Sequence, residues 1–424
     1  MSRILTDILI VGAGPAGLAA ATAASTAGSK VTLVDENPRV GGQIWRAELG
    51  KTKSPDAQKF LTAFDNDRVQ IISSATIFDV AGTNVLAAQT PNGRIDIEYQ
   101  KLILATGARE RFLPVPGWTQ PGVFGAGGLQ ALVKGGLSIE NKRVIVAGTG
   151  PLLLAVADYM KTRGAVVLLI AEQTSAAKIR RFARGLWRQP DKMIQAAALR
   201  ARLLGIPYKT DTWVTRVEQP EGGSLSVSEG VTRPLAISLA SRGSIRSMTC
   251  DYLACGFHLV PNLELPSLLG CDIQNGFVFV DRHQQTSVAN VYCAGEPTAI
   301  AGVEASLIEG EIAGLAVSGQ IEKAGTLFKR HDAAKRFGDA LNRTFGLRPE
   351  LKQLANDNTF VCRCEDVSLG SLKTYKSFRE AKLQTRCGMG PCQGRVCGPA
   401  VGFLFGWQPA SVRPPIFPVK MEHL

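Results

Sequence analysis

The chain has 424 residues, of which 45% are hydrophobic and 20% are charged, and its formal net charge is +12. This length allows two or three domains, and the composition is that of an ordinary globular protein. No uninterrupted apolar run is long enough to cross a bilayer. We therefore expect no integral membrane segment and, without a signal segment, a cytoplasmic protein.

The positive charge is scattered along the chain and has no interleaved aromatic residues, so we expect no nucleic-acid partner. Its densest group consists of four arginines, Arg180, Arg181, Arg184 and Arg188. Such a group predicts either a solvated helix face or a docking surface for an acidic partner.

In chain order, the first feature is a segment, residues 7–43, with the pattern of a nucleotide-binding βαβ unit. An apolar run at residues 8–11 predicts a buried parallel strand, and an Ala-rich helix follows. Between them, Gly12, Gly14 and Gly17 have the spacing G-x-G-x-x-G. These glycines permit a tight turn, close approach to a pyrophosphate and close helix–strand packing. The helix N-terminus then faces the phosphates.

A second predicted strand, residues 31–34, ends on two acids, Asp35 and Glu36. Both lie at the distance from the glycines at which an acid binds the ribose hydroxyls. The strand, the helix and the acid together distinguish this motif from a glycine turn that binds nothing. The segment therefore predicts a site for an adenine dinucleotide.

Two later segments resemble pieces of the first site in flavoproteins with two dinucleotide-binding domains. The strand predicted at residues 101–105 runs into Thr106-Gly107, and the strand predicted at residues 291–294 runs into Gly295-Glu296. In those flavoproteins an aspartate at the second place meets the flavin ribityl chain, and Glu296 is one methylene longer. The predicted site residues are Gly12, Gly14, Pro15, Ala16, Gly17, Asp35, Glu36, Asn37, Gly42, Gln43, Ala105, Thr106, Gly107, Gly295 and Glu296.

A second dinucleotide-like unit begins at Arg143. Gly148 and Gly150 match the first two glycines of the motif, but Leu153 stands at the third position. A side chain there opposes close helix–strand packing. The sequence thus predicts the fold of this unit and leaves a bound nicotinamide nucleotide open.

The nine cysteines are unevenly distributed. Four of them stand among apolar neighbours, as buried small residues do: Cys250, Cys255, Cys271 and Cys293. The other five lie close together near the C-terminus, and such clusters in cytosolic chains indicate a metal rather than disulfides. They are Cys362, Cys364, Cys387, Cys392 and Cys397.

Thiolates are soft ligands that suit zinc or an iron–sulfur cluster. Zinc knuckles favour Cys-x2-Cys in both halves, whereas the last three cysteines here are each separated by four residues. We therefore prefer a [2Fe–2S] cluster. Cys362 and Cys364 form the first pair of ligands, and Cys387, Cys392 and Cys397 compete for the second pair.

Several segments, spread over nearly the whole chain, carry a resemblance to a known family: VGAGPAGLAAA, LVDENPRVGGQIWR, ATGARER, LACGFHLVPNLEL, CRCEDV, RCGMGPCQGRVCG and RPPIFPV. With them the chain resembles the larger flavoprotein subunits of opine oxidases, hydrogen cyanide synthase, and hydroxyproline- and sarcosine-oxidising complexes. The resemblance implies an α/β, glutathione-reductase-like flavoprotein fold with two dinucleotide-binding domains. It adds a small C-terminal cysteine-rich [2Fe–2S] domain like bacterioferritin-associated ferredoxin. In related subunits the final cysteine pair supplies two ligands, so we prefer Cys392 and Cys397, with Cys387 as the alternative.

The resemblance also implies that this chain relays electrons. In the family, an amino-acid-oxidase-like flavoprotein, the β subunit, oxidises the C–N bond of an opine or related amine. The implied cofactors are FAD, or another adenine nucleotide such as NAD, in the first site, a [2Fe–2S] cluster, and FMN at the subunit interface. The implied assembly is a hetero-oligomer, with a small third subunit in some cases, that delivers electrons to a respiratory acceptor.

We identify no catalytic residues in this chain. It shows no Ser/His or His/Asp arrangement, and no cysteine pair near Gly41-Gly42 such as a disulfide reductase of this fold would have. Two other hypotheses stay open. One is a self-sufficient NAD(P)H-dependent reductase that feeds its own cluster, and the other is a non-catalytic scaffold with a structural nucleotide and zinc.

The expected domain boundaries follow from these assignments. The first dinucleotide-binding domain is discontinuous and comprises residues 1–113 and 284–325, and the second comprises residues 114–283. Residues 326–355 form a helical linker, and residues 356–424 form the [2Fe–2S] domain.

Overall fold

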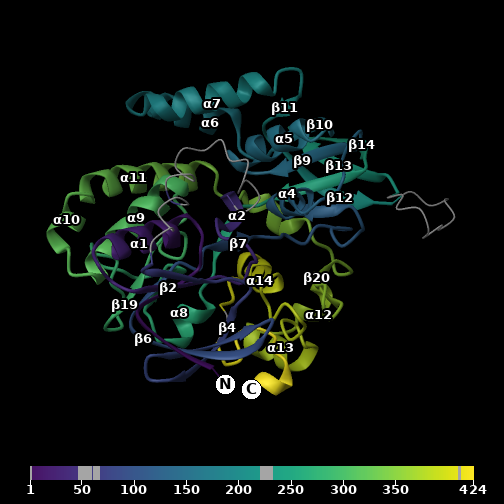
Figure 1. The fold of residues 1–424 in the computed structure, drawn as a ribbon. Coiled ribbons are helices and arrows are strands. Elements are labelled where there is room, and N and C mark those ends of the chain that lie inside the picture. Colours follow the sequence, from purple (N-terminus) through teal and green to yellow (C-terminus); the bar gives the residue numbers. More distant parts are fainter. Residues whose placement is uncertain (1, 46–59, 61–66, 220–232, 409–411) are drawn as a thin grey trace. The chain divides into compact units, whose positions relative to one another are not determined.

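The computed structural model describes residues 2–45, 60, 67–219, 233–408 and 412–424. The chain divides into two compact units, each of which is described by itself (Figure 1). The first unit comprises Met1–Arg109, Pro261–Ala340 and Ser411–Leu424, and the second comprises Glu110–Val260 and Leu341–Ala410. The domain boundaries expected from the sequence stay a prediction.

The first unit is built on a seven-stranded sheet with the order β3-β2-β1-β6-β5-β4, in which β19 also pairs with β6. Strands β3, β2, β1, β6 and β19 are parallel, whereas β4, β5 and β6 form an antiparallel meander. The strands of this sheet are β1 (Ser2–Val11), β2 (Val31–Val34), β3 (Val69–Ile72), β4 (Thr76–Gly82), β5 (Val85–Thr90), β6 (Gly93–Leu104) and β19 (Val291–Cys293). A separate two-stranded sheet consists of β17 (Ile273–Gln274) and β18 (Phe277–Val278).

The helices of this unit are α1 (Pro15–Thr26), α2 (Gly42–Trp45), α8 (Glu264–Leu268), α9 (Val303–Val317), α10 (Ile321–Gly325), the greater part of α11 (Phe328–Thr344) and the 3-10 turn η3 (Met421–His423). Helices α1 and α9 pack against the sheet, and α10 packs against α9. Helices α1 and α9 pack closely because both present small residues at their contact. An added Cβ at Gly310 or Gly314 of α9 would overlap the carbonyl oxygen of Ala16 or Ala20 in α1.

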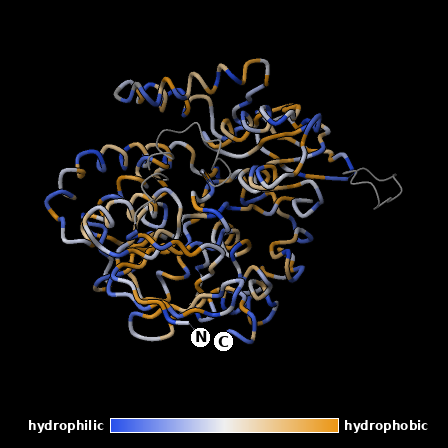
Figure 2. The backbone as a smooth tube through the Cα atoms, viewed as in Figure 1, coloured by the Kyte–Doolittle hydropathy of each residue, from blue (hydrophilic) through white to orange (hydrophobic). Residues whose placement is uncertain are grey.

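The second unit has a parallel sheet with the order β11-β10-β9-β15-β8 and a separate antiparallel sheet, β12-β13-β14. Its elements are β8 (Val123–Gly125), α4 (Ala126–Lys134), β9 (Arg143–Gly148), α5 (Leu152–Thr162), β10 (Val166–Glu172), α6 (Ala176–Gly185), η1 (Leu186–Arg188), α7 (Pro190–Arg202), β11 (Tyr208–Lys209), β12 (Thr212–Glu218), β13 (Leu235–Ser241), β14 (Ser244–Cys250) and β15 (Tyr252–Gly256). Two short strands, β7 (Ala108–Glu110) and β16 (Leu259–Pro261), lie where the chain passes between units. The hydrophobic residues of both units concentrate on the strands (Figure 2).

The cysteine-rich segment belongs to the second unit and has a small core of its own. Its elements are η2 (Pro349–Gln353), β20 (Phe360–Cys362), β21 (Val367–Ser368), α12 (Leu369–Leu372), α13 (Phe378–Thr385) and α14 (Cys397–Phe405). Val396 and Phe403 pack against the core of the second unit, and the Trp118 indole donates a hydrogen bond to the Phe360 carbonyl at 2.6 Å. The cysteines are thus held on a fixed support. Among the described helices, none has the length and apolar character needed to span a membrane.

The α1–α9 contact leads to a stability prediction. Replacing Gly310 by leucine should lower the free energy of unfolding by about 1–3 kcal/mol, because the side chain has to displace the α1 backbone. Gly185→Ala is the control, since an added Cβ there meets no atom within 4 Å. Chemical denaturation of both variants measures the difference, and equal stabilities would contradict the close packing.

Candidate nucleotide site and cysteine cluster

Most of the predicted nucleotide-site residues follow parallel strands of the first unit at their carboxyl ends, and the other two, Gly42 and Gln43, open helix α2. Their strands, β2, β1, β6 and β19, are neighbours in that order. Gly12 to Gly17 follow β1, Asp35 to Asn37 follow β2, Ala105 to Gly107 follow β6, and Gly295 and Glu296 follow β19. The sheet therefore brings them to one edge, the edge at which open α/β sheets bind their ligands.

Asp35 ties the first glycine turn to the second strand. Its Oδ2 accepts a hydrogen bond from the Ala13 backbone N–H at 2.6 Å, and its Oδ1 accepts one from the Asn37 backbone N–H at 2.8 Å. Asp35 and Ala13 are both buried, so the Ala13 N–H would have no water as an alternative partner. Asp35 thus shapes the turn in addition to any contact with a ribose.

The glycines of this turn allow three pieces of backbone to meet. An added Cβ at Gly12 would overlap the Ala105 carbonyl oxygen, and one at Gly17 would overlap the Gly12 carbonyl oxygen. At Gly42, which opens α2, it would lie 2.9 Å from the Gly14 Cα. The close approach therefore requires glycine at these positions.

Glu296 lies beside the turn after β6. Its Oε2 is 3.8 Å from the position of a Cβ added at Gly107, and its carboxylate accepts a hydrogen bond from the Ala108 backbone. Burial raises the pKa of Glu296 above its ordinary value. The two segments predicted to complete the site, 106–107 and 295–296, are therefore adjacent in the first unit.

Glu309 is a site residue that sequence reasoning missed. It is 3% exposed and lies within α9, where its Oε2 accepts hydrogen bonds from the Gly295 backbone N–H and the Thr298 hydroxyl, both at 2.8 Å. Its Oε1 lies 3.0 Å from His331 Nε2. Glu309 positions the turn that carries Glu296. An acid inside a helix of small, apolar residues was the available signal.

The second glycine turn repeats the arrangement of the first. Glu172, at the end of β10, is fully buried. It accepts hydrogen bonds from the backbone N–H groups of Gly150 and Thr174, both at 2.7 Å, and its burial raises its pKa. Leu153 replaces the third glycine and is fully buried, with its Cδ2 3.1 Å from the position of a Cβ added at Gly256 of β15. A glycine on the neighbouring strand thus makes room for the leucine.

Residues 345–348 lie over this second turn. The Thr149 hydroxyl donates a hydrogen bond to the Phe345 carbonyl at 2.9 Å, and the Phe345 Cβ and Cγ are 3.8 Å from the position of a Cβ added at Gly150. The Gln173 side chain donates to the Gly346 carbonyl at 3.0 Å and accepts from the Arg348 N–H at 2.9 Å. Phe345 is 6% exposed. The chain itself therefore occupies the face of the glycine turn.

The five C-terminal cysteines form one connected group. The Sγ atoms of Cys362, Cys387 and Cys397 all lie within 4.8 Å of one another, and the three residues are buried. Cys392, which is half-buried, forms side-chain hydrogen bonds with Cys397 and with the exposed Cys364. The structure thus brings Cys387, the alternative ligand, next to Cys362 and Cys397, and places Cys364 and Cys392 on the outer side.

The chemistry of this group fits a thiolate-bound metal. Two thiolates on one tetrahedral metal at about 2.3 Å lie roughly 3.8 Å apart, which the inner three thiols satisfy with little movement. Hydrogen bonds from Cys387 and Cys397 lower the pKa of Cys362, and a hydrogen bond from Cys397 lowers the pKa of Cys392 to about 5. Cys362 and Cys392 are therefore the two that favour the thiolate, the ligand form. Hydrogen bonds within the group raise the pKa of Cys387 and Cys397, and burial raises the pKa of Cys364.

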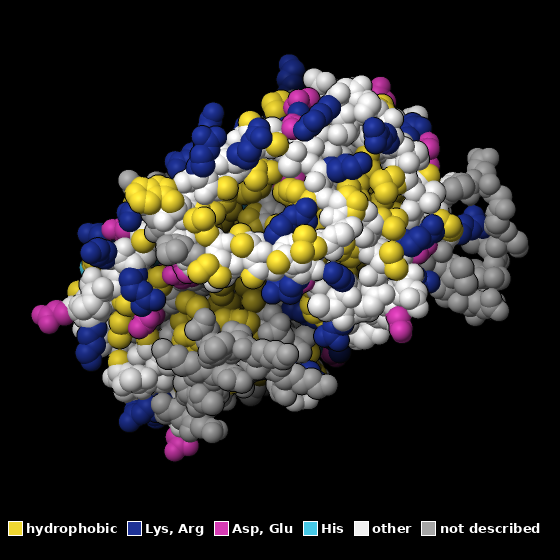
Figure 3. Space-filling model, turned by 90° about the horizontal axis from the view of Figure 1, so that it is seen from above, with side chains coloured by type: hydrophobic (Ala, Val, Ile, Leu, Met, Phe, Trp, Pro, Cys, Tyr) yellow, Lys and Arg dark blue, Asp and Glu magenta, His cyan; other side chains and the backbone are white. Residues whose placement is uncertain are grey.

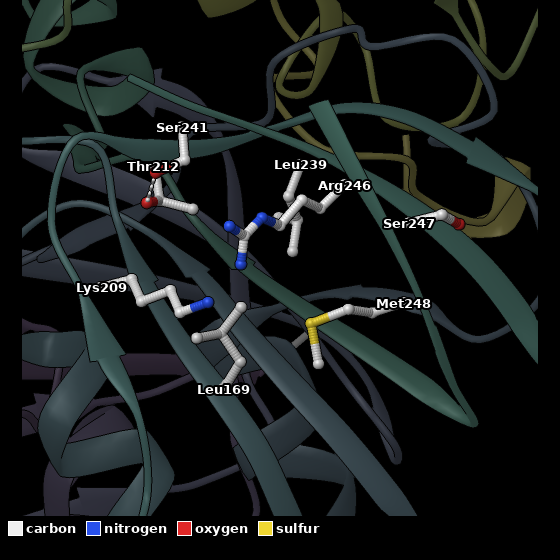
Figure 4. Close-up of a pocket in the computed structure, with 8 residues that line it drawn as sticks. All are labelled: Leu169, Lys209, Thr212, Leu239, Ser241, Arg246, Ser247 and Met248. Atoms are coloured by element: carbon white, nitrogen blue, oxygen red, sulfur yellow. Dashed lines mark hydrogen bonds between the residues drawn. The ribbon is translucent and has the colours of Figure 1, made fainter. Parts of the chain in front are cut away.

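A small pocket of about 180 Å³ lies in the second unit between β10, β11 and the β12-β13-β14 sheet. Figure 4 shows the Lys209 and Arg246 side chains pointing into it beside Leu169 and Met248. Sites for drug-sized ligands and cofactors have volumes of roughly 300–1,000 Å³, and no predicted site residue lines this pocket. It is not the nucleotide site.

Comparisons with known proteins agree with this architecture. The model of the pyridine nucleotide-disulphide oxidoreductase family matches residues 6–318. The chain is 30% identical to the A subunit of opine oxidase from Agrobacterium tumefaciens (strain Ach5), over 99% of this chain and 91% of that protein. It is 29% identical to the HcnB subunit of hydrogen cyanide synthase from Pseudomonas aeruginosa, over 92% and 90%.

Among solved structures, L-proline dehydrogenase from P. horikoshii matches all of this chain and 80% of that one, with a TM-score of 0.69 at 19% identity, a likeness of fold. The predicted α/β fold with a C-terminal cysteine cluster is confirmed, and so is the predicted family. The first cysteine of the chain is Cys250, so the disulphide of the family's name has no counterpart near the first glycine turn. The chain belongs to the pyridine nucleotide-disulphide oxidoreductase family and, within it, to the group that includes the A subunit of opine oxidase.

Proposed function

We propose that this chain is the electron-transferring flavoprotein and iron–sulfur subunit of a hetero-oligomeric dehydrogenase for an opine or a related secondary amine. The observation that carries the proposal is the presence, in one chain, of a fully built glycine turn and a cluster of buried thiols. The similarity to the A subunit of opine oxidase over 99% of the chain supports the substrate class.

The first unit would hold FAD, or another adenine dinucleotide, at the carboxyl ends of β1, β2, β6 and β19. The α1 N-terminus, which has no acidic residue in its first turn, would receive the pyrophosphate. Glu36 and Asp35 are the candidates for the ribose hydroxyls, and Glu296 is the candidate for the ribityl chain. These roles extend the predicted site, and the hydrogen bonds of Asp35 and Glu309 support them because they fix the turns before a ligand arrives.

The cysteine group would hold a [2Fe–2S] cluster through Cys362, Cys364, Cys392 and Cys397, with Cys387 as the alternative to one member of the final pair. A flavin exchanges one or two electrons and such a cluster exchanges one, so together they connect a two-electron oxidation to one-electron acceptors. Oxidation of the C–N bond would take place in an amino-acid-oxidase-like partner, with FMN at the interface and a respiratory acceptor downstream.

The alternative, a reductase that takes its electrons from NAD(P)H, is not favoured by the second glycine turn. Residues 345–348 and their hydrogen bonds to Thr149 and Gln173 occupy the face on which a nicotinamide nucleotide would lie. Electrons therefore have to come from another donor, which the proposal identifies as the partner subunit.

The first experiment is to co-express the chain with its partner and to purify the complex. We expect bound flavin, two iron and two acid-labile sulfide per chain, and reduction of both groups by the amine only when the partner is present. Turnover of the amine by this chain alone would overturn the proposal. One zinc without iron or sulfide would favour the scaffold hypothesis.

Asp35→Ala should lower both stability and nucleotide content. The substitution leaves the backbone N–H groups of Ala13 and Asn37 without an acceptor, at a cost of about 1–3 kcal/mol each when buried. Glu36→Ala is the matched control, because it should reduce the nucleotide content while leaving the two hydrogen bonds of Asp35 in place. Thermal unfolding and the cofactor released by heat measure the two effects. Wild-type stability of Asp35→Ala would show that the turn does not depend on this side chain.

Mixing the flavin-loaded chain with NADH under anaerobic conditions should leave the flavin absorbance unchanged, because residues 345–348 cover the second turn. Dithionite should bleach the same sample, which shows that the flavin is reducible. Rapid bleaching by NADH would instead support the self-sufficient reductase.

Single Cys→Ser substitutions should show which of the five cysteines are ligands of the cluster. We expect Cys362→Ser and Cys397→Ser to lose iron and sulfide, because the first belongs to the secure pair and the second lies beside it in the buried group. Cys364→Ser and Cys392→Ser should do the same if the preferred set is correct, whereas Cys387→Ser should keep the cluster. Cys250→Ser is the control, since this residue is buried elsewhere in the second unit. Loss of iron in Cys387→Ser with retention in Cys392→Ser would reverse the assignment.

A further inference from the structure

Helices α6 and α7, with η1 between them, expose most of their residues. Helix α6 has no buried residue. In α7, the described residues from Met193 to Ala198 are all exposed, and only Lys192 and Leu199 are half-buried. Residues 176–204, which we call the α6–α7 surface, thus form helices that bury few of their side chains against the described part of the chain.

Several contacts attach the segment to the second unit. The Phe182 ring packs edge-on against the Phe345 ring with 5.7 Å between centroids. Leu199 packs against the core that contains the buried Leu203, and Arg202 pairs with Asp158 at 3.0 Å. A helix as short as α7 is marginal in water without tertiary packing. Within the described residues, Met193 to Ala198 of α7 lack the tertiary packing that such a helix needs, and a partner molecule would supply it.

The exposed side chains are of the kinds that dominate protein interfaces. Trp187, Ile194 and Leu204 are 67%, 68% and 74% exposed, and Met193 is 45% exposed. Trp, Met and Arg are enriched in the centres of interfaces. An isolated exposed apolar residue has no significance, but here four lie within eighteen residues of chain that also contain an exposed run of three alanines, Ala196 to Ala198.

The charge of the segment is strongly one-sided. Residues 176–204 contain one acid, Asp191, and eight basic residues: Lys178, Arg180, Arg181, Arg184, Arg188, Lys192, Arg200 and Arg202. Within the described part of the chain, the exposed Arg180, Arg181 and Arg184 form no ion pair. Figure 3 looks onto the side of the molecule on which α6 and α7 lie in Figure 1, and it shows Lys and Arg side chains next to hydrophobic ones.

We propose that the α6–α7 surface docks an acidic, partly apolar surface of the amine-oxidising partner subunit, which rests on the hetero-oligomer of the proposed function. A second copy of this chain is a poor occupant, because it carries the same net charge of +12. Opposite charges on the partner would speed and orient the encounter, and Ile194, Met193 and Leu204 would supply the apolar contact.

The test compares two variants with equal changes of charge in the full chain. The surface variant is Arg180→Glu/Arg181→Glu/Arg184→Glu, and the control is Lys329→Glu/Lys335→Glu/Arg336→Glu on the exposed face of α11. We expect the dissociation constant for the purified partner to rise at least tenfold in the surface variant and less than twofold in the control. The salt dependence of binding should weaken in the surface variant alone.

Ile194→Asp provides a second variant that tests the apolar contact, and we expect at least a tenfold faster dissociation. Circular dichroism and flavin content should stay at wild-type values in all of these variants. The inference is overturned if the partner binds the surface variant as it binds wild type. It is also overturned if that variant loses only affinity for anionic lipid vesicles or for DNA. Failure of the wild-type chain to bind the partner at all would instead refute the proposed function, together with its docking surface.

Discussion

Each glycine turn in this molecule is held by a hydrogen bond. A backbone N–H of the turn donates it to an acid at the end of the next parallel strand along the chain. In the first unit the donor is Ala13 and the acid is Asp35, and in the second unit they are Gly150 and Glu172. Each acid also accepts a hydrogen bond from the residue two positions further on, Asn37 or Thr174. Both turns are therefore shaped by buried carboxylates of the chain, whether or not a ligand is bound.

The two turns differ in the residues that pack against them. The longer glutamate of the second turn reaches Gly150, one position further along the motif than the Ala13 that Asp35 reaches. In the second unit Leu153, in the first turn of α5, stands in place of the third glycine, and a phenylalanine from a distant part of the chain lies on the turn. The same supersecondary element thus serves as a candidate ligand site in one unit and as a support for the chain in the other.

The sequence predicted those features that local patterns encode. The strand, glycine turn, helix and acid of residues 7–43 are present, because hydrophobic periodicity and glycine spacing act over a few residues. The densest group of arginines lies on α6 and η1, and α7 begins separately at Pro190, a residue that suits the first position of a helix. The crowding of the cysteines was visible because they are close in sequence.

The features that sequence reasoning missed depend on long-range contacts. Thr149 and Phe345 are 196 positions apart, and no periodicity reports that a phenylalanine after α11 covers a glycine turn. In the sequence, Glu309 looks like an ordinary acid on a helix, and only the fold brings its carboxylate to the Gly295 N–H, from which it accepts a hydrogen bond. The proximity of Cys387 to Cys362 likewise depends on how the chain between β21 and α14 folds, which the number of intervening residues does not determine.

The segment that covers the second turn, residues 345–348, belongs to the same chain as the turn. A free nucleotide would therefore have to compete with a group that is covalently tethered to the site. A tethered group has an effective concentration that commonly reaches the millimolar range, and here hydrogen bonds through Thr149 and Gln173 add to it. A free nucleotide at cellular levels would have to outcompete a ligand that never diffuses away. The second turn is therefore a point at which the chain is fastened, and the fastened segment leads along the chain to Cys362, the first thiol of the cluster.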